Sequence, residues 1–522
     1  MSVLLLTLLL PLAGFFIILL LPRKSNGAWA VALFFSLAAF LSSLGLIGPV
    51  SKTPAQPTSV IDVMWVEGAN IHFHVGVDGI NIWLVLLTTV LLPVGIWISQ
   101  RLVSERTTTF YALLLLFEFG LIGVFSALDL FVFYVFWEVA LVPMYLMVGG
   151  WGGARRGYAA VKFFVYTMSG SVMMLASIIY LANRAGTFDY TQIVAALTSG
   201  TLTLTTHEQL LLFLGFFAAF AVKVPIFPLH TWLPVTYTEA PAPATFLLAA
   251  VMSKMGAYGL LRYCLPLFPN GARQCADWIV VLAITGIIYG ALIAFVQPNI
   301  KKVIAYSSLS HLGFVVLGIF SFQQQGADGA VYQMVAHGVS TGALFILAGY
   351  LEHRRGSMEI RDFGGVATLA PGLAAAFMIA MLASIGLPTL SNFVGEYLVL
   401  QGAAFTNFTW AAWAAVGVIL SAVYMLWLYQ RTFLGKPGHD VGVVTDLRTA
   451  EWAPVVPLVI IMVWLGTYTQ SFMPPITAAN QHLLEQSKMN LEIRVQQRTS
   501  PANVLSNASV VHAAWKETGD GR

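Results

Sequence analysis

Long apolar runs recur along the whole chain and constrain its fold more than any other feature. A helix of about 20 apolar residues is long enough to cross the hydrocarbon core of a bilayer. The 522 residues are 58% hydrophobic and 9% charged, with a mean hydropathy of +0.80. These values exclude a soluble globular protein and predict an all-α polytopic membrane protein. About fourteen transmembrane spans are expected, near residues 2–21, 28–49, 80–98, 109–127, 129–149, 159–183, 209–237, 241–263, 276–297, 302–320, 328–350, 371–405, 409–432 and 453–471.

Charges in the loops predict how these spans are oriented. Taken alternately, the loops place fourteen lysines and arginines on one side of the membrane and four on the other. By the positive-inside rule the richer side is cytoplasmic, so both termini are expected on the external side. The first run, Ser2–Leu21, is interpreted as a retained span and not a signal peptide, because Arg23 and Lys24 follow it instead of preceding it.

Two of the expected spans combine a charged residue with a proline-containing break. The stretch Phe216–Trp232 contains Lys223 and two prolines, and Ala374–Phe405 is broken around Pro388 and contains Glu396. A charge at mid-bilayer costs at least about 2.5–3.5 kcal/mol, and a proline removes a helical hydrogen bond. Both segments are therefore expected to be discontinuous helices that face protein or a water-filled cavity. A lysine that snorkels to the membrane edge, or a kink that only serves packing, is the alternative.

The two breaks occupy matching places in two blocks of five spans. Pro225 falls 116 residues after Thr109, and Pro388 falls 112 residues after Ala276. Because five is odd, the second block crosses in the opposite sense, which predicts inverted repeats with an ion path at their interface. Coincidence is the alternative. The expected domains are residues 1–108 with spans 1–3 and an external loop, 109–263 as the first repeat, 276–432 as the second, 453–471 as span 14, and 475–522 as an external, partly disordered polar tail.

Two short segments outside the expected spans predict further structure. Ile71–Val77 alternates with a period of two, which indicates a short external strand or hairpin. His72 and His74 share one face of it, but two histidines without further ligands are more often surface residues than a metal site. In the polar tail, Ile476–Leu484 is typical of a short interfacial helix.

Several functions are disfavoured by what the chain lacks. The net charge of +3 provides no basic stripe for nucleic acid. Cys264 and Cys275 do not have the spacing of a metal or iron–sulfur site, so reduced thiols are expected, with a disulfide as the alternative. The glycine-rich run at 149–153 lacks the lysine and hydroxyl of a phosphate loop and predicts a plain loop after the fifth span.

Ionisable residues within the expected spans are few, and each is a candidate functional group. Acids, lysines and histidines on successive helices have the chemical make-up of a proton relay, because each takes up and releases a proton in response to its neighbours. Glu118 and Lys162 lie in spans but suggest no particular step, and Asp129 lies at a span end. The primary candidates are Glu138, Lys223, Lys254, His311, His337 and Glu396, and the secondary candidates are Glu118, His230 and Glu239.

The residue types allow more than one interpretation of each group. Glu138 and Lys223 are expected to pair, either as a titrating couple or as a static salt bridge between two helices. Lys254 has no acid within its own helix, which favours a role in which it gains and loses a proton. For His311 and His337, a hydrogen bond to a backbone carbonyl is the alternative to a relay.

Dense motifs contain these residues, and they are DLFVFYVFWEVALVPMYLMVGGWGG, KVPIFPLHTWLP followed by TEAP, SKMGAYGLLR, KKVIAYSSLSHLGF, QMVAHGVSTGALF and GLPTLSNFVGEYL. Together they resemble the antiporter-like subunits of respiratory complex I. The resemblance extends to about residue 485 and is strongest to the M-type subunit, called chain 4 in mitochondria. Glu396 agrees with that type, since the sister L and N types and the D-type antiporter subunits have lysine there.

The resemblance implies a proton-pumping subunit of NADH:quinone oxidoreductase in the bacterial inner membrane, without a redox centre or metal of its own. NADH, FMN, iron–sulfur clusters and quinone would belong to partner subunits, and L-type and N-type sister subunits would be neighbours. The matching motifs imply Glu138 and Lys223 as the coupling pair and Lys254 as the central lysine. They imply His311 and His337 as the connecting relay and Glu396 as the terminal residue toward the external side.

The chain also departs from the family pattern at three places. Val235–Tyr237 replaces a segment that usually contains an acid and a histidine, Asn299 replaces an aspartate, and Leu351–Glu359 lacks a usual histidine–threonine–arginine sequence. Two alternatives therefore stay open. One is a subunit of a multisubunit cation/proton antiporter or of a related redox-driven pump that does not use NADH. The other is a structural membrane-arm subunit that translocates nothing.

Overall fold

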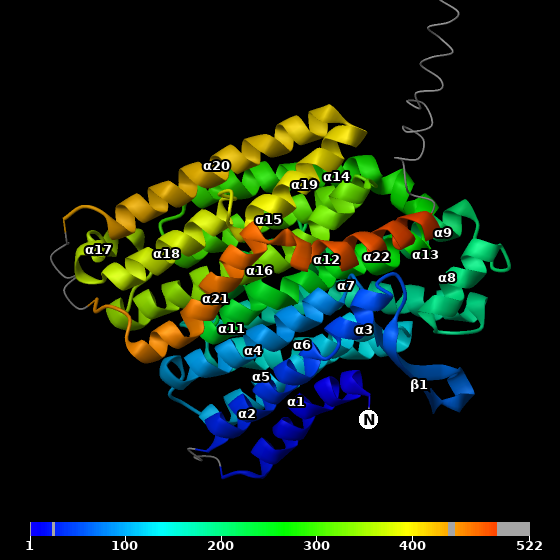
Figure 1. Cartoon of the computed structure of the whole chain (residues 1–522), viewed down its shortest axis with the longest axis horizontal. Helices are drawn as coiled ribbons and strands as arrows, with labels where there is room; N and C mark the ends of the chain where they lie inside the picture. Colours follow the sequence, from blue (N-terminus) through cyan, green and yellow to red (C-terminus); the bar gives the residue numbers. More distant parts are fainter. Residues whose placement is uncertain (1, 23–26, 437–443, 488–522) are drawn as a thin grey trace, which may run out of the picture.

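A computed structural model describes residues 2–22, 27–436 and 444–487, and most of them are helical. Among these residues, twelve helices are long and apolar enough to cross a membrane. They lie side by side in one bundle, with α20 along one edge and the β1 hairpin projecting from one end (Figure 1). The predicted all-α polytopic fold is confirmed. The predicted total of fourteen spans requires that the two segments with helix breaks also cross the membrane. This total stays a prediction.

The helices follow one another with short connections. Their bounds are α1 (Val3–Leu20), α2 (Ala28–Leu44), α3 (Ile47–Lys52), α4 (Ile82–Leu102), α5 (Thr107–Ser126), α6 (Leu130–Trp151), α7 (Arg156–Ala185), α8 (Tyr190–Ser199), α9 (Thr206–Lys223), α10 (Leu233–Glu239), α11 (Ala242–Leu247), α12 (Ser253–Gly259), α13 (Leu265–Leu267), α14 (Pro269–Val296), α15 (Ile300–Phe320), α16 (Gln324–Arg355), α17 (Val366–Leu369), α18 (Pro371–Ser384), α19 (Ser391–Thr406), α20 (Phe408–Phe433), α21 (Thr449–Thr467) and α22 (Met473–Gln486).

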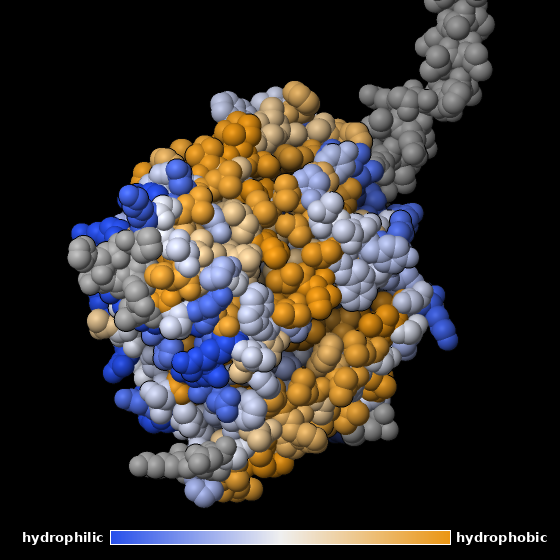
Figure 2. Space-filling model, turned by 60° about the vertical axis from the view of Figure 1, so that its left-hand side comes forward, coloured by the Kyte–Doolittle hydropathy of each residue, from blue (hydrophilic) through white to orange (hydrophobic). Residues whose placement is uncertain are grey.

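Burial separates the helices into an inner and an outer set. The continuous segment α11–α13 and helix α16 are completely buried over their apolar stretch, and α15 is nearly so. Helices α1, α2, α7, α14, α20 and α21 are less than half buried and present apolar side chains outward. Figure 2 shows the result, an apolar belt with hydrophilic residues gathered mainly at either side of it. A belt of this kind is what a bilayer requires, and it leaves the inner helices shielded from lipid.

Close approach between the inner helices depends on a small residue. At Gly338 of α16, a Cβ atom would lie only 2.6 Å from the carbonyl oxygen of Ala250. Lipid tails are as apolar as leucine, so helices in a membrane associate through close packing of this kind. The glycine lets α16 lie directly against the neighbouring segment and places His337 beside Lys254.

Both predicted helix breaks are present. Helix α9 ends at Lys223 and α10 begins at Leu233, while α18 ends at Ser384 and α19 begins at Ser391. The first break compensates for its lost helical hydrogen bonds with a side chain, because the Trp232 indole donates to the carbonyl oxygen of Val222 at 2.9 Å. An unwound backbone at membrane depth needs such internal partners.

The predicted external strand is present as one arm of a hairpin. Strand β2 (Ile71–Val77) pairs antiparallel with β1 (Thr58–Val66), which the sequence analysis did not identify. The two histidines do not converge on one ligand. Nδ1 of His72 lies 2.6 Å from Oδ1 of Asp62, and Nδ1 of His74 lies 2.6 Å from Oδ2 of Asp189. Each histidine is therefore paired with a different carboxylate.

Three further predictions have outcomes in the structure. The predicted loop at 149–153 is wrong for its first three residues, because α6 continues to Trp151. At this helix end the Arg106 guanidinium donates to the carbonyl oxygen of Gly150 at 2.6 Å and stacks on the Trp151 ring. The predicted tail helix is confirmed as α22, and the expected disorder beyond it falls outside the described residues. Cys264 and Cys275 are both free and buried, as expected.

Candidate functional site

Lys254 lies fully buried in a helix with an irregular backbone. The π-helical segments Leu248–Met252 and Leu260–Cys264 flank α12, which contains Lys254. In the first of them the Ser253 amide donates to Leu248 O, five residues back. The Ala249 carbonyl then accepts hydrogen bonds from the side chains of Ser253 at 3.1 Å and Lys254 at 2.5 Å. Such π-segments occur frequently at functional sites, and no sequence pattern predicted them here.

A chain of four predicted residues connects this lysine to the second helix break. Lys254 Nζ lies 2.8 Å from Nδ1 of His337. The ring of His337 lies 5.8 Å from the ring of His311, centroid to centroid. Nδ1 of His311 lies 2.6 Å from Oε1 of Glu396. All four side chains are buried, with at most 3% of any residue exposed.

The protonated nitrogens of the two histidines follow from their partners. An ammonium group can only donate, so His337 accepts at Nδ1 and, when neutral, has its proton on Nε2. An ionised carboxylate can only accept, so His311 donates from Nδ1 to Glu396 and leaves Nε2 as an acceptor. Among the residues that the structure describes, neither Nε2 atom has a hydrogen-bond partner. In these protonation states His337 has an N–H donor, and His311 an acceptor nitrogen, that no described residue satisfies.

The Glu396 carboxylate is fixed by two further residues. Gln333 Nε2 donates to Oε1 of Glu396 at 2.9 Å. Gly386, in the break itself, has a φ of +77°, and a Cβ atom there would lie 3.2 Å from Oε2 of Glu396. Only glycine adopts this backbone conformation without strain and leaves room for the carboxylate.

Uncharged polar residues next to the chain were missed in the sequence, which was searched only for ionisable groups. Gln333 lies four residues before His337 on α16, so the two share a helix face, and that spacing was the available signal. Asn392, at the start of α19, accepts a hydrogen bond from Ser340 Oγ at 3.1 Å and so connects the second break to α16. Both amides are completely buried.

Lys223 and Glu138 do not form an ion pair in this structure. In the part of the chain that the structure describes, the Lys223 ammonium and Oε1 of Glu138 have no hydrogen-bond partner, so the predicted ion pair is not formed. The ammonium instead lies over the rings of Trp137 at 5.1 Å and Phe163 at 5.7 Å. Cation–π contacts of this type partly offset the cost of a buried cation. Trp137 directly precedes Glu138, so the lysine lies close to the helical turn that contains the acid.

The secondary candidates lie apart from this chain of residues. Glu118 is completely buried in α5, and the hydroxyl group of Ser36 is its polar neighbour. His230 stacks on the ring of Phe227 within the first break. Glu239 pairs with Arg155 at 3.3 Å and borders a cavity of about 280 Å³ that Lys301 also lines.

The two remaining residues have local roles. Asp129 accepts hydrogen bonds from the backbone amides of Phe131 at 2.8 Å and Val132 at 3.0 Å, so it is the N-cap of α6. Lys162 lies between the rings of Tyr158 and Tyr166 on the half-exposed helix α7. Neither residue contacts the Lys254 chain.

Two of the three departures from the family pattern have structural partners. Asn299 replaces an aspartate and still caps α15, because its side chain accepts from the Lys302 amide at 3.3 Å. In the segment Leu351–Glu359, Arg354 pairs with the buried Glu451 at 2.6 Å. Within the described ranges, no group of three or more histidine, cysteine, aspartate or glutamate residues is placed to bind a metal ion.

Comparisons with known proteins show the family and the fold of this chain. The family described as NADH:quinone oxidoreductase/Mrp antiporter, TM matches residues 127–423. NADH-quinone oxidoreductase subunit M of Rhodobacter capsulatus is 42% identical over 491 residues, which cover 91% of this chain and 95% of that protein. The subunit M of Mycobacterium tuberculosis is 39% identical over 514 residues, which cover 91% of this chain and 93% of that protein.

Solved structures show the same fold. A chain of respiratory complex I from Thermus thermophilus with bound NADH superposes with a TM-score of 0.84 at 35% identity, covering 94% of this chain and 99% of that one. A chain of the Mrp complex from Dietzia sp. DQ12-45-1b gives a TM-score of 0.79 at 21% identity over 94% of this chain and 97% of that one, which shows a common fold alone. The resemblance identified from the motifs is confirmed, and the chain belongs to the family of membrane-spanning subunits of NADH:quinone oxidoreductases and Mrp antiporters.

Proposed function

We propose that this chain moves protons across the membrane along Lys254, His337, His311 and Glu396, driven by quinone reduction in partner subunits. The supporting observation is the buried row of contacts at 2.8 Å and 2.6 Å, separated by two free Nε2 atoms. One water molecule between the histidine rings would complete the path, and bridging waters serve as well as direct hydrogen bonds. A proton then passes from His337 to His311 and on to Glu396.

Lys223 and Glu138 are proposed to control this path. A buried ammonium over the ring of Trp137, the residue next to Glu138, would form a couple with two arrangements, separated and paired. Approach of Glu138 stabilises the proton on Lys223, and its withdrawal favours release. The contacts of Lys223 with the two aromatic rings support the separated arrangement as one of these states.

The proposed setting is the membrane arm of an NADH:quinone oxidoreductase in the bacterial inner membrane. The M subunits of Rhodobacter capsulatus and Mycobacterium tuberculosis are subunits of such an enzyme by name. L-type and N-type sister subunits are the proposed neighbours, and NADH, FMN, iron–sulfur clusters and quinone belong to partner subunits. Both termini are proposed to be external, residues 109–263 and 276–432 to be inverted repeats, and the cavity beside Glu239 to admit protons from the cytoplasm.

The experiment is proton pumping by the purified parent complex in proteoliposomes. Lys254→Met and Glu396→Gln remove a titrating group while they nearly conserve its volume, and we expect both to lower proton uptake and NADH-driven quinone turnover. Lys162→Met is the matched control, because this lysine on α7 lies outside the path, and it should pump normally. Blue-native electrophoresis establishes that each complex is assembled.

The alternatives predict different results. Normal pumping by assembled Lys254→Met and Glu396→Gln complexes would mean that the buried charges only fix packing, as in a structural subunit. Sodium-dependent transport in vesicles that contain neither NADH nor quinone would instead indicate a cation/proton antiporter.

A further inference from the structure

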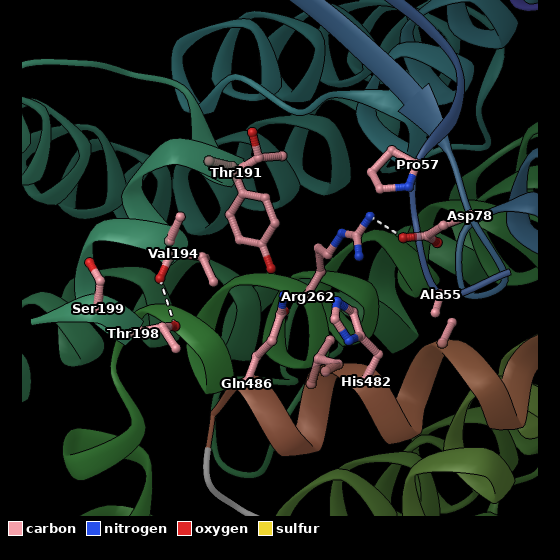
Figure 3. Close-up of a pocket in the computed structure, with 14 residues that line it drawn as sticks. Ala55, Pro57, Asp78, Thr191, Val194, Thr198, Ser199, Arg262, His482 and Gln486 are labelled. Carbon is pink, nitrogen blue, oxygen red and sulfur yellow. Dashed lines mark hydrogen bonds and ion pairs between the residues drawn. The ribbon is translucent and has the colours of Figure 1, made fainter. Parts of the chain in front are cut away.

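A second polar cavity lies at the end of the bundle where the hairpin, α8 and α22 meet. Its volume is about 460 Å³, within the range of about 300–1,000 Å³ typical of small-molecule pockets. Figure 3 shows Arg262, His482 and Gln486 in its interior, between Thr191, Thr198 and Ser199 of α8 and the segment with Ala55 and Pro57. None of its lining residues belongs to the proposed proton path.

Arg262 is the buried charge of this cavity. Its side chain is 8% exposed and donates from Nη2 to Oδ2 of Asp78. Among the residues that the structure describes, the Nε atom is buried without a hydrogen-bond partner. A guanidinium group has five N–H donors in a planar fork, and an unsatisfied buried donor is costly. The contact with Asp78 therefore does not satisfy all the donors of Arg262.

Asp78 does not compete strongly with an incoming anion for the N–H donors of Arg262. Its other oxygen, Oδ1, already accepts from the backbone amides of Ile80 at 3.0 Å and Asn81 at 3.2 Å. The two backbone amides and the Arg262 guanidinium satisfy the carboxylate, and the guanidinium retains further N–H donors for a second acceptor.

Helix α22 adds donors to the same cavity. Gln486 Nε2 lies 2.9 Å from Nε2 of His482. An amide nitrogen can only donate, so the imidazole accepts at Nε2 and, in its neutral form, has an N–H at Nδ1. Gln486 also retains its second N–H. Within the described ranges, an arginine, a histidine and a glutamine therefore provide N–H donors at the cavity, while Val194, Ala479 and Leu483 provide an apolar wall.

We propose that this cavity binds a phosphate group, either on a phospholipid headgroup or as free phosphate. A tetrahedral oxyanion accepts several hydrogen bonds at once and matches the fork of an arginine. The apolar wall accommodates the glycerol part of a lipid. Binding here ties the hairpin end, α8 and α22 together, at the external end of the helix that contains Lys254.

The test is binding to the purified parent complex, delipidated in detergent. Hydrogen exchange of α8 and α22 is measured with dioleoyl phosphatidylglycerol micelles, with inorganic phosphate, and with neither. The double variant His482→Leu/Gln486→Leu removes two donors and leaves the Arg262–Asp78 pair intact. Its matched control is Gln481→Leu, because Gln481 is exposed on the same helix and donates to Glu485 at 2.9 Å.

We expect slower exchange with ligand in wild type and in the control, and an affinity about tenfold lower in the double variant, since hydrogen bonds to charged groups contribute that much. Protection by phosphatidylglycerol alone identifies a lipid headgroup, and protection by inorganic phosphate identifies the free anion. Equal protection of the double variant and wild type, or no protection by either probe, would overturn the proposal. Because binding is measured without turnover, failure here is distinct from failure of the proposed proton path.

Discussion

Nδ1 of His311 lies 2.6 Å from Oε1 of Glu396, although the two residues are 85 positions apart in the sequence. Helix α15 contributes the histidine and α19, which follows the second break, contributes the acid. The contact is completely enclosed by protein, so the charge state of each group depends directly on the other. It is the last link of the proposed path before the external side.

His311→Gln tests this link. Glutamine retains a hydrogen-bond donor for Glu396 but cannot take up a proton. We expect proton pumping to fall at least about tenfold, because positioned proton-transfer groups contribute about 10²–10⁴-fold. Proteoliposome pumping measures the effect. Gln333→Leu is the comparison, since it removes the other donor to the same oxygen without removing a titrating group, and it should lower pumping much less. Equal losses in both variants would indicate that only positioning of Glu396 matters.

Gly386→Ala tests the backbone that supports the acid. The positive φ of +77° disfavours any residue with a Cβ atom, and the added methyl group would meet Oε2 of Glu396. We expect an assembled complex that is destabilised by about 1–3 kcal/mol, the typical cost of a strained backbone, and that pumps poorly. Gly157→Ala on α7 is the control, because no atom lies within 4 Å of its Cβ position. Thermal inactivation together with pumping provides the measurement.

Lys223→Ala and Glu138→Ala test the proposed control of the path. Each variant is expected to lower pumping and turnover strongly while the complex still assembles, because neither side chain makes a structural ion pair in this arrangement. A double-mutant cycle of pumping rates detects coupling between residues that are not in contact. Additive losses, or normal pumping by the assembled double variant, would contradict the assignment.

Sequence patterns predicted the inner path more completely than the outer elements. Lys254, His337, His311 and Glu396 are conspicuous because ionisable residues are rare in apolar spans, and the structure brings all four into one row. The resemblance implied their order in outline, but the contacts between them could not be predicted, because these depend on tertiary packing at sites such as Gly338.

Other structural features left little or no pattern in the sequence from which to predict them. The π-helical turns beside Lys254 are a backbone irregularity with no compositional mark, so the span appeared regular. The distance between Lys223 and Glu138 depends on the Trp137 ring, which pattern reasoning treats only as apolar bulk. Strand β1 was missed because its residues are mostly exposed and its partner strand alone showed clear alternation.

The contact between His74 and Asp189 outside the membrane-spanning helices predicts a pH dependence of the hairpin. Burial lowers the pKa of His74, but the hydrogen bond and the charge of Asp189 outweigh it and raise the pKa above 6.5. For Asp189, burial raises the pKa, and the hydrogen bonds from His74, Thr191 and Gln192 bring it below 3.8. The pair therefore stabilises the attachment of the hairpin to α8.

The sign of the effect follows from these directions. The raised pKa of His74 stabilises the closed hairpin fully below pH 6.5, and this contribution is lost as the pH rises through the pKa of the folded state. The lowered pKa of Asp189 adds stability above pH 3.8, which is lost on further acidification. Hydrogen-exchange protection of residues 71–77, corrected for intrinsic rates, is expected to be greatest between these limits. For His74→Gln, the protection should not change with pH across pH 6–8. If the protection of the wild type is equally independent of pH, the His74–Asp189 pair does not stabilise the attachment of the hairpin.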